Sequence, residues 1–312
     1  MSFLGSDIIS VSQYQRADLE RIFATAKSCI PISRGKPSGR PLEGKVLANL
    51  FFEPSTRTRL SFGTAFLRLG GSLETTVGMQ FSSMVKGETL EDTIRVIDGY
   101  ADAIVIRHPT KGAAARAAAV AQGPVINAGD GDGEHPSQAV LDLFTINQEL
   151  GRVDETNIAL VGDLRYGRTV HSLAKLLAIY DKVRLLFVAP DALAMPEKIT
   201  NFLDERGVAW ENVKSLDLAV QRADVLYVTR IQAERFEDPT MAARLAGSYL
   251  VDRALLARNR REDIIIMHPL PRYGDLSTDV DVLPGAAYFR QAHYGVPVRM
   301  ALFCDIFGCT PL

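Results

Sequence analysis

Short apolar runs alternate with longer amphipathic stretches along nearly the whole chain, a pattern typical of parallel α/β sheets. The apolar runs predict strands at residues 46–52, 103–106, 125–127, 158–161, 183–188, 225–229 and 264–267. The amphipathic stretches predict helices at residues 58–69, 90–100, 136–150 and 169–180. We therefore expect an α/β protein in which helices flank parallel sheets.

The division of the chain follows from its length and from one break in the pattern. At roughly 100–200 residues per domain, 312 residues suggest two domains. One predicted helix ends near Gly151 and the next strand begins at Ile158, so we place the boundary there. Residues 1–150 and 151–312 are then two domains of similar size. The last apolar helix, about residues 287–307, is long enough to pack back on the first domain.

Composition excludes several classes of protein. Lysine and arginine total 35 against 37 acidic residues, and this net charge of −2 argues against a bulk nucleic-acid binder. Cys29, Cys304 and Cys309 show no C-x-x-C spacing, and the histidines are too scattered for a zinc site. There is no apolar run of about 18 residues and no N-terminal signal-peptide pattern. We expect a soluble cytoplasmic protein without a membrane or nucleic-acid partner.

The segment after the first predicted strand is rich in groups that bind anions. Ser55, Thr56, Arg57 and Thr58 open a helix, whose N-terminus already offers unpaired N–H groups and a favourable dipole. The alternative is that Ser55 simply caps the helix. Capping needs one hydroxyl and no neighbouring arginine, so we favour a phosphate-binding site.

A second segment, residues 162–169, also follows a strand and opens a helix. It nearly matches the P-loop pattern, but Arg168 stands where that pattern requires lysine, and G-x-G-x-x-G is absent. Such glycines commonly just permit a tight turn. The segment does place Arg168 after a strand, where open α/β sheets bind ligands.

Arginine recurs at this position in the pattern. Arg57, Arg107, Arg168 and Arg230 each follow a predicted strand, although the protein is close to neutral. A single arginine there is most often a solvated surface residue. The repetition predicts a local positive cleft for a small substrate with several negative charges.

Two further loops follow strands. The acidic, glycine-rich residues 127–138 lack the spacing of a calcium loop, and they place His135 just before a proline suited to the first position of a helix. In His268-Pro269-Leu270-Pro271-Arg272, the prolines remove N–H donors and leave carbonyls as acceptors. Taken alone, residues 268–272 are better interpreted as a rigid structural turn. An isolated histidine is more often structural than catalytic, but the place of His135 between a strand and a helix favours a functional role more than usual.

Together these motifs resemble the catalytic chains of aspartate carbamoyltransferases, in the expected order from Phe51 to about Arg299. Ser-Thr-Arg-Thr-Arg is shared by carbamoyltransferases generally. The discriminating features are residues 268–272, the Lys86-Gly87-Glu88-Thr89 loop and residues 162–169. Ornithine carbamoyltransferases typically have cysteine where this chain has Pro269, and a Ser-Met-Gly loop, which is absent here. Aspartate is therefore the favoured acceptor.

The resemblance implies transfer of the carbamoyl group of carbamoyl phosphate to the amine of L-aspartate, in pyrimidine biosynthesis, with no metal or organic cofactor. Arg57, Thr58, Arg107 and His135 are the implied catalytic residues. Carbamoyl phosphate would be bound by Ser55, Thr56, Arg57, Thr58, Ser82, Lys86, Arg107, His135, Gln138 and the carbonyls of Pro269 and Leu270. L-Aspartate would be bound by Lys86, Arg168, Arg230 and Gln232.

The resemblance also implies a homotrimer, in which Ser82 and Lys86 reach the site of a neighbouring subunit. The family often has a second basic residue before the loop lysine, where this chain has Val85. Regulatory chains or a dihydroorotase as further partners remain open from the sequence.

Alternatives from other classes are weaker. A P-loop hydrolase lacks its lysine, and a dinucleotide-dependent dehydrogenase lacks its glycine pattern. A non-catalytic scaffold in a pyrimidine-pathway complex would not need to keep the arginines and His135. Ornithine or another amine acceptor is the second choice within the same chemistry.

Overall fold

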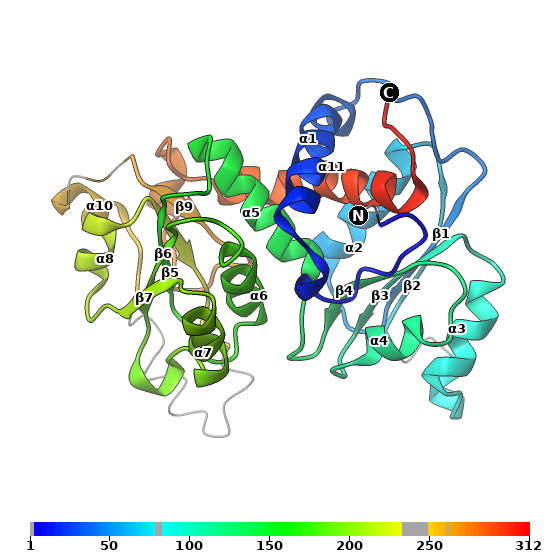
Figure 1. Cartoon of the computed structure of the whole chain (residues 1–312), viewed down its shortest axis with the longest axis horizontal. Helices are drawn as coiled ribbons and strands as arrows, with labels where there is room; N and C mark the ends of the chain where they lie inside the picture. Colours follow the sequence, from blue (N-terminus) through cyan, green and yellow to red (C-terminus); the bar gives the residue numbers. More distant parts are fainter. Residues whose placement is uncertain (1–2, 79–82, 233–248, 260, 262) are drawn as a thin grey trace. The chain divides into compact units, whose positions relative to one another are not determined.

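The computed structural model describes residues 3–78, 83–232, 249–259, 261 and 263–312, and it divides into two compact units. Unit 1 comprises Met1–Leu141 and His293–Leu312, and unit 2 comprises Asp142–Ala292. Each unit contains its own parallel sheet flanked by helices, as predicted (Figure 1). The division lies within helix α5 (Pro136–Leu150), whereas the sequence places a domain boundary at residues 150–151.

Unit 1 is built on a parallel sheet with the strand order β2-β1-β3-β4. Its elements are η1 (Val11–Gln13), α1 (Arg16–Ser33), β1 (Val46–Phe51), α2 (Thr56–Arg68), β2 (Ser72–Val77), η3 (Ser83–Lys86), α3 (Leu90–Asp98), β3 (Ala103–His108), α4 (Ala113–Ala118) and β4 (Val125–Asp130).

Helices cover both faces of this sheet (Figure 1). On one face, Leu50 of β1 and Ile104 of β3 pack with Ile94 of α3 and Ala114 of α4. On the other face, Phe303 of α11 (Tyr288–Phe307) contacts the rings of Phe62 and Phe66 of α2 edge-on, with centroids 6.0 and 4.9 Å apart. Helix α11 thus completes the core of unit 1, which confirms the predicted return of the C-terminal helix to the first half of the chain.

Unit 2 is built on a parallel sheet with the order β7-β6-β5-β8-β9. Its elements are β5 (Asn157–Val161), α6 (Arg168–Leu177), β6 (Arg184–Val188), η4 (Asp191–Leu193), α7 (Glu197–Glu205), β7 (Ala209–Asn212), α8 (Leu216–Arg222), β8 (Val225–Val228), α10 (Arg253–Arg258), β9 (Ile265–Met267) and η6 (Thr278–Val282).

The sequence missed two strands and several helices. Strands β2 and β7 lie at the edges of their sheets and are half-buried or exposed, so their sequences lack the apolar run of a central strand. The sequence pattern also did not predict the helices α1, α4, α7, α8 and α10. All but α1 are short, with at most nine residues, and too brief to show a clear helical period.

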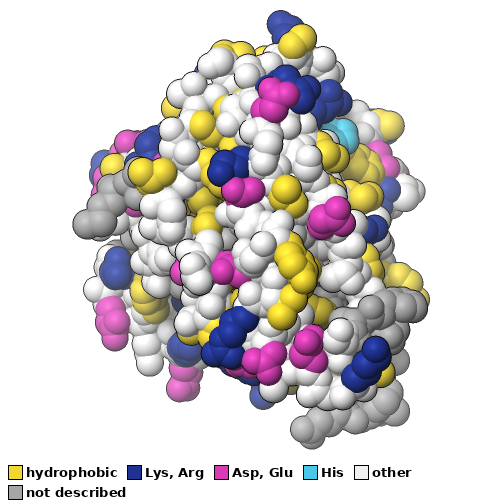
Figure 2. Space-filling view, turned by 90° about the vertical axis from the view of Figure 1, so that its right-hand side faces the viewer, with side chains coloured by type: hydrophobic (Ala, Val, Ile, Leu, Met, Phe, Trp, Pro, Cys, Tyr) yellow, Lys and Arg dark blue, Asp and Glu magenta, His cyan; other side chains and the backbone are white. Residues whose placement is uncertain are grey.

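The surface carries mixed charge. Basic and acidic side chains are interspersed on the face shown in Figure 2, as the small net charge of −2 leads one to expect. No helix within the described ranges combines the length and apolar character that a bilayer crossing requires.

Candidate active site

The topology of each sheet marks one place where a ligand is expected. In unit 1 the chain leaves β1 toward β2 on one side, and β3 lies on the other side. In unit 2 it leaves β5 toward β6, and β8 lies on the opposite side. Open α/β sheets bind ligands outside the carboxyl ends of strands at such points of reversal. The expected sites therefore lie beyond β1 and β3 in unit 1, and beyond β5 and β8 in unit 2.

Beyond β1, the start of α2 provides anion-binding groups. Ser55 occupies the N-cap position with an extended backbone, but its hydroxyl makes no capping hydrogen bond. The amides of the first turn have no intrahelical acceptor. Thr58 is buried in the same turn as Arg57. Because the hydroxyl of Ser55 does not serve the helix, the structure favours the anion site over simple capping.

Near the end of β3, a buried arginine faces the end of β1. Arg107 lies within the strand, one residue before its last, and not after the strand as predicted from the sequence. Arg107 is 9% exposed, and its Nη2 donates to Glu53 Oε1 at 2.6 Å. Its Nη1 donates to the carbonyl of Ala128 at 3.2 Å. Its Nε is buried and has no hydrogen-bond partner in the described ranges. Arg107 therefore keeps at least its Nε donor available for a ligand, while two contacts fix its plane.

The two arginines of this edge influence each other electrostatically. Partial burial, and to a smaller extent the positive charge of Arg107, lower the pKa of Arg57 from its ordinary value. Arginine remains charged despite such a shift. The lowered pKa therefore means that the positive charge of Arg57 lacks a neutralising partner among the described residues. A bound anion would relieve this, as expected for a phosphate site.

Beyond β4, the glycine-rich loop is folded around Asp130. One carboxylate oxygen of Asp130 accepts from Asn127 Nδ2 at 3.1 Å and from the Glu134 amide at 2.9 Å. The other accepts from the Gly112 amide at 2.8 Å. The loop delivers His135, which is 4% exposed, to the start of α5, one turn before the half-buried Gln138. The acidic loop is thus a support for His135.

In unit 2, the ends of β5 and β8 approach each other closely. A Cβ on Gly162 would lie 2.2 Å from the carbonyl oxygen of Thr229, so only glycine fits there. Buried Asp163 accepts from the Tyr166 amide at 2.9 Å and from the Gln232 amide at 3.2 Å. Asp163 thereby ties the loop before Arg168 to the segment that carries Gln232.

Three of the four residues predicted to bind aspartate share this edge of unit 2, and the fourth, Lys86, lies in unit 1. Arg168 begins α6 after β5, and Arg230 and Gln232 lie in the segment after β8. All three side chains are half-buried. Two guanidinium groups and an amide at neighbouring strand ends suit a small dicarboxylate.

The third strand end of this edge presents hydrogen-bond acceptors. Pro269 and Leu270 follow β9, the neighbour of β8. Their carbonyl oxygens, like that of Pro271, accept no hydrogen bond from the part of the chain that the structure describes. They are therefore available to a donor such as an N–H₂ group.

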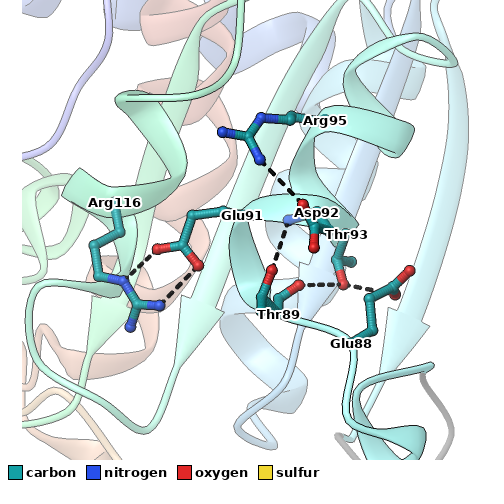
Figure 3. Close-up of polar contacts among 7 residues, drawn as sticks. All are labelled: Glu88, Thr89, Glu91, Asp92, Thr93, Arg95 and Arg116. Atoms are coloured by element: carbon teal, nitrogen blue, oxygen red, sulfur yellow. Dashed lines mark hydrogen bonds and ion pairs between the residues drawn. The ribbon is translucent and has the colours of Figure 1, made fainter.

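The remaining predicted residues lie in the loop after β2. Ser82 lies outside the described residues, and Lys86 ends η3 with an exposed side chain. The segment that follows is anchored (Figure 3): Thr89 caps α3 by accepting from the Asp92 amide at 3.1 Å. Glu88 accepts from the hydroxyl of Thr93 at 2.8 Å. Lys86 is therefore exposed and lies shortly before the capped N-terminus of α3.

Sequence reasoning assigned no role to Glu53 or Asp163. Both come two positions after the end of a central strand, and both contact residues that carry or precede the candidate site. An acidic residue one or two positions after a buried strand was a usable indication, because a buried carboxylate requires a hydrogen-bonding partner nearby.

Comparisons with known proteins agree with this arrangement. Residues 6–148 match the family model for the carbamoyl-phosphate-binding domain of aspartate and ornithine carbamoyltransferases. Residues 154–306 match the model for the aspartate- or ornithine-binding domain of the same enzymes.

Individual relatives narrow the family. The aspartate carbamoyltransferase catalytic subunit of Thermococcus gammatolerans is 50% identical over 97% of both chains. The Trypanosoma cruzi aspartate transcarbamoylase, solved with carbamoyl phosphate and aspartate, is 45% identical with a TM-score of 0.91 over 97% of both chains. The Methanocaldococcus jannaschii catalytic subunit is 47% identical with a TM-score of 0.89, over 97% of this chain and 98% of that one. Since these relatives span nearly the whole sequence, the chain belongs to the aspartate carbamoyltransferase family.

Proposed function

We propose that this protein transfers the carbamoyl group of carbamoyl phosphate to the amine of L-aspartate, giving N-carbamoyl-L-aspartate and phosphate for pyrimidine biosynthesis. One observation carries the proposal: each sheet has cationic groups at its point of strand reversal. The set in unit 1 combines a helix N-terminus with Arg57 and Arg107, which suits a phosphate. The set in unit 2 contains Arg168 and Arg230, which suit two carboxylates.

Carbamoyl phosphate would be held through its phosphate by Ser55, Thr56, Arg57 and Thr58. The free Nε of Arg107 gives that residue a donor for the carbonyl or the bridging oxygen. The carbamoyl N–H₂ group would donate to the carbonyls of Pro269 and Leu270, and Gln138 would contact the same group.

Attack of the aspartate amine on the carbonyl carbon creates a negative charge on the carbonyl oxygen. Thr58, Arg107 and His135 would stabilise it. Because Glu53 and the Ala128 carbonyl already hold Arg107, this residue needs little reorganisation during the reaction. Arg168, Arg230 and Gln232 would orient the acceptor. The departing phosphate can take the proton from the amine, so no separate general base is required.

We further propose a cytoplasmic homotrimer in which Ser82 and Lys86 complete the site of a neighbouring subunit. The exposure of Lys86 is compatible with this role. A trimer assembled from Arg57→Ala and Lys86→Gln chains would regain some intact sites if residues are shared. Activity no higher than that of the separate variants, with mixed trimers verified, would rule out the shared site.

Ligand binding gives a test that does not depend on turnover. The probe is N-(phosphonacetyl)-L-aspartate, the ligand in another Trypanosoma cruzi structure, which joins a phosphonate to an aspartate. A ligand raises the melting temperature of a protein that binds it only when folded. We expect this compound to raise it more than phosphate and L-aspartate added together. Absence of any shift would contradict the proposal.

A further inference from the structure

A histidine–aspartate pair holds the turn after β9. The Leu270 amide donates to Nδ1 of His268 at 2.8 Å. On the other side of the ring, Nε2 of His268 is hydrogen-bonded to Asp275 Oδ2. His268 is 1% exposed and Asp275 is 7% exposed, so water does not compete for these bonds. The turn is therefore linked to a buried carboxylate through one imidazole ring.

These bonds determine where the ring carries its proton. A backbone amide can only donate, so Nδ1 must be the unprotonated acceptor. The proton then resides on Nε2 and is donated to Asp275. Burial would raise the pKa of Asp275, but hydrogen bonds from His268 and from the Tyr273 amide hold it below the usual value. An ionised carboxylate accepts only, which secures the same tautomer from the other side.

The turn presents acceptors and no donor. Pro269 and Pro271 have no N–H group, so Leu270 supplies the one amide donor of these three residues, and His268 occupies it. The three carbonyls accept nothing within the described ranges. Such a surface can bind a primary amide, which has N–H donors. It can make no hydrogen bond to a group without such donors.

The backbone of the turn needs outside support. Leu270 has a φ of 55°, in the left-handed region that is unfavourable for a bulky side chain. Such conformations persist where the surroundings impose them, and they cluster at functional sites. Asp275 supplies part of this support, because its Oδ1 accepts from the Tyr273 amide at 2.6 Å and its carbonyl accepts from Val251 at 2.9 Å.

The histidine itself is fixed from behind. Its own amide donates to Gln291 Oε1 at 2.8 Å, and Gln291 Nε2 donates to Asp142 at 2.6 Å. The hydroxyl of Tyr227 donates to the second oxygen of Asp142 at 2.7 Å. All these side chains are buried, so His268 belongs to a rigid polar network in unit 2.

A second His-Pro turn in the same chain shows what the carboxylate adds. In His108-Pro109-Thr110, after β3, the Thr110 amide donates to Nδ1 of His108 at 3.0 Å. That turn closes in the same way, yet its Nε2 is buried with no hydrogen-bond partner among the residues described. A His-Pro turn therefore does not need a carboxylate to form. The bond from His268 to Asp275 is an addition that the His108 turn lacks.

We propose that Asp275, acting through His268, is a positioning residue that aims the carbonyls of Pro269 and Leu270 at the N–H₂ group of the carbamoyl donor. This inference rests on the proposed function. On this proposal, Asp275 and His268 together enable the enzyme to distinguish a carbamoyl group from an acyl group of similar shape.

The principal test is Asp275→Asn. A carboxamide can donate to Nε2, and the ring proton of His268 then moves to Nδ1. A protonated Nδ1 cannot accept the hydrogen bond from the Leu270 amide. Displacement of groups that hold the substrate typically costs about 100-fold in rate. We expect kcat with carbamoyl phosphate to fall about 10–100-fold, with the KM for aspartate and the circular dichroism spectrum unchanged. The matched control is Asp279→Asn, which alters an exposed aspartate of the following segment.

A second donor separates positioning from general damage. Acetyl phosphate has a methyl group in place of N–H₂, so it gains nothing from the two carbonyls. The ratio of its inhibition constant to the KM of carbamoyl phosphate should shrink in Asp275→Asn. Equal weakening of both compounds would overturn the proposal, and so would wild-type kinetics. A wild-type protein with no transfer activity would instead refute the proposed function.

Replacement of the histidine completes the test. An asparagine side chain can accept from the amide two residues ahead, as in an Asx turn. His268→Asn should therefore retain more activity than His268→Leu. In the His268→Asn background, Asp275→Asn should add little further loss, because its link to the turn is already gone. Fully additive losses would show that Asp275 acts independently of His268.

Discussion

Glu53 and Arg107 form an ion pair of 2.6 Å that joins the ends of the two neighbouring strands β1 and β3. The contact lies where the order of the first sheet reverses, which is where a ligand is expected. Because the Arg107 guanidinium also donates to the Ala128 carbonyl at 3.2 Å, its plane is fixed before any substrate arrives. The chemistry proposed here depends on such prior orientation.

Replacing this arginine by lysine should therefore inactivate the protein without unfolding it. A lysine keeps the charge but cannot span Glu53, Ala128 and a ligand with a single ammonium group. We expect Arg107→Lys to lower kcat/KM by about 100–1,000-fold, the usual cost of losing one oxyanion donor. Steady-state kinetics measure this, with Arg68→Lys on the exposed end of α2 as the control. Wild-type kinetics for Arg107→Lys would refute its proposed role.

Arg57 and Arg68 lie on the same helix and provide a matched pair. Arg57 stands in the first turn of α2 beside the unused hydroxyl of Ser55, whereas Arg68 is exposed in the last turn. We expect Arg57→Ala to abolish transfer and phosphate binding while leaving the melting temperature nearly unchanged. Arg68→Ala should keep both activities. Calorimetric titration with phosphate distinguishes the two variants. Equal phosphate affinity of both variants would count against a phosphate site at Arg57.

Arg230 should affect the acceptor and not the donor. Hydrogen bonds to charged groups contribute about 1.5–3 kcal/mol, so Arg230→Ala is expected to raise the KM for aspartate about 10–100-fold. Binding of carbamoyl phosphate, measured separately, should change little. Arg165→Ala is the control, since Arg165 is exposed and lies over the ring of Tyr166. An increase confined to carbamoyl phosphate would reverse the assignment.

A surface ion pair gives a prediction about pH. Arg116 donates to both carboxylate oxygens of Glu91, at 2.7 and 2.9 Å (Figure 3), and lowers the pKa of Glu91 from 4.5 to about 2. A depressed folded-state pKa stabilises the protein above pH 4.5, and the contribution is lost as the pH falls toward 2. The difference in melting temperature between the wild type and Arg116→Gln should shrink over that range. A difference that stays constant would show that the pair does not act through its charges.

Central strands and the helix start at Ser55 were predictable because their patterns are local. Residues 46–51 form an apolar run that is almost wholly buried, and α2 begins within two residues of the predicted position. Strand β2 was missed because its sequence, Ser-Leu-Glu-Thr-Thr-Val, belongs to an exposed sheet edge. A strand becomes an edge strand because of the strands that pair beside it. The sequence of β2 alone therefore does not reveal its position in the sheet.

Some residues of the candidate site were likewise predictable from local patterns, and others were not. Arg168 and Arg230 could be found because each follows a strand. The link from Asp275 to the Leu270 amide could not, because it passes through a ring that must face both. The contact of Gly162 with Thr229 likewise depends on the pairing of β5 with β8, which joins residues far apart in the chain.

The most direct test of the account is a carbamoyl-transfer assay on the purified chain with carbamoyl phosphate and either L-aspartate or L-ornithine. Mass spectrometry of the products identifies the acceptor without a coupling enzyme. We predict N-carbamoyl-L-aspartate and phosphate in equal amounts, and no product from ornithine. Citrulline formation, or no transfer to either amine by a folded trimer, would contradict it.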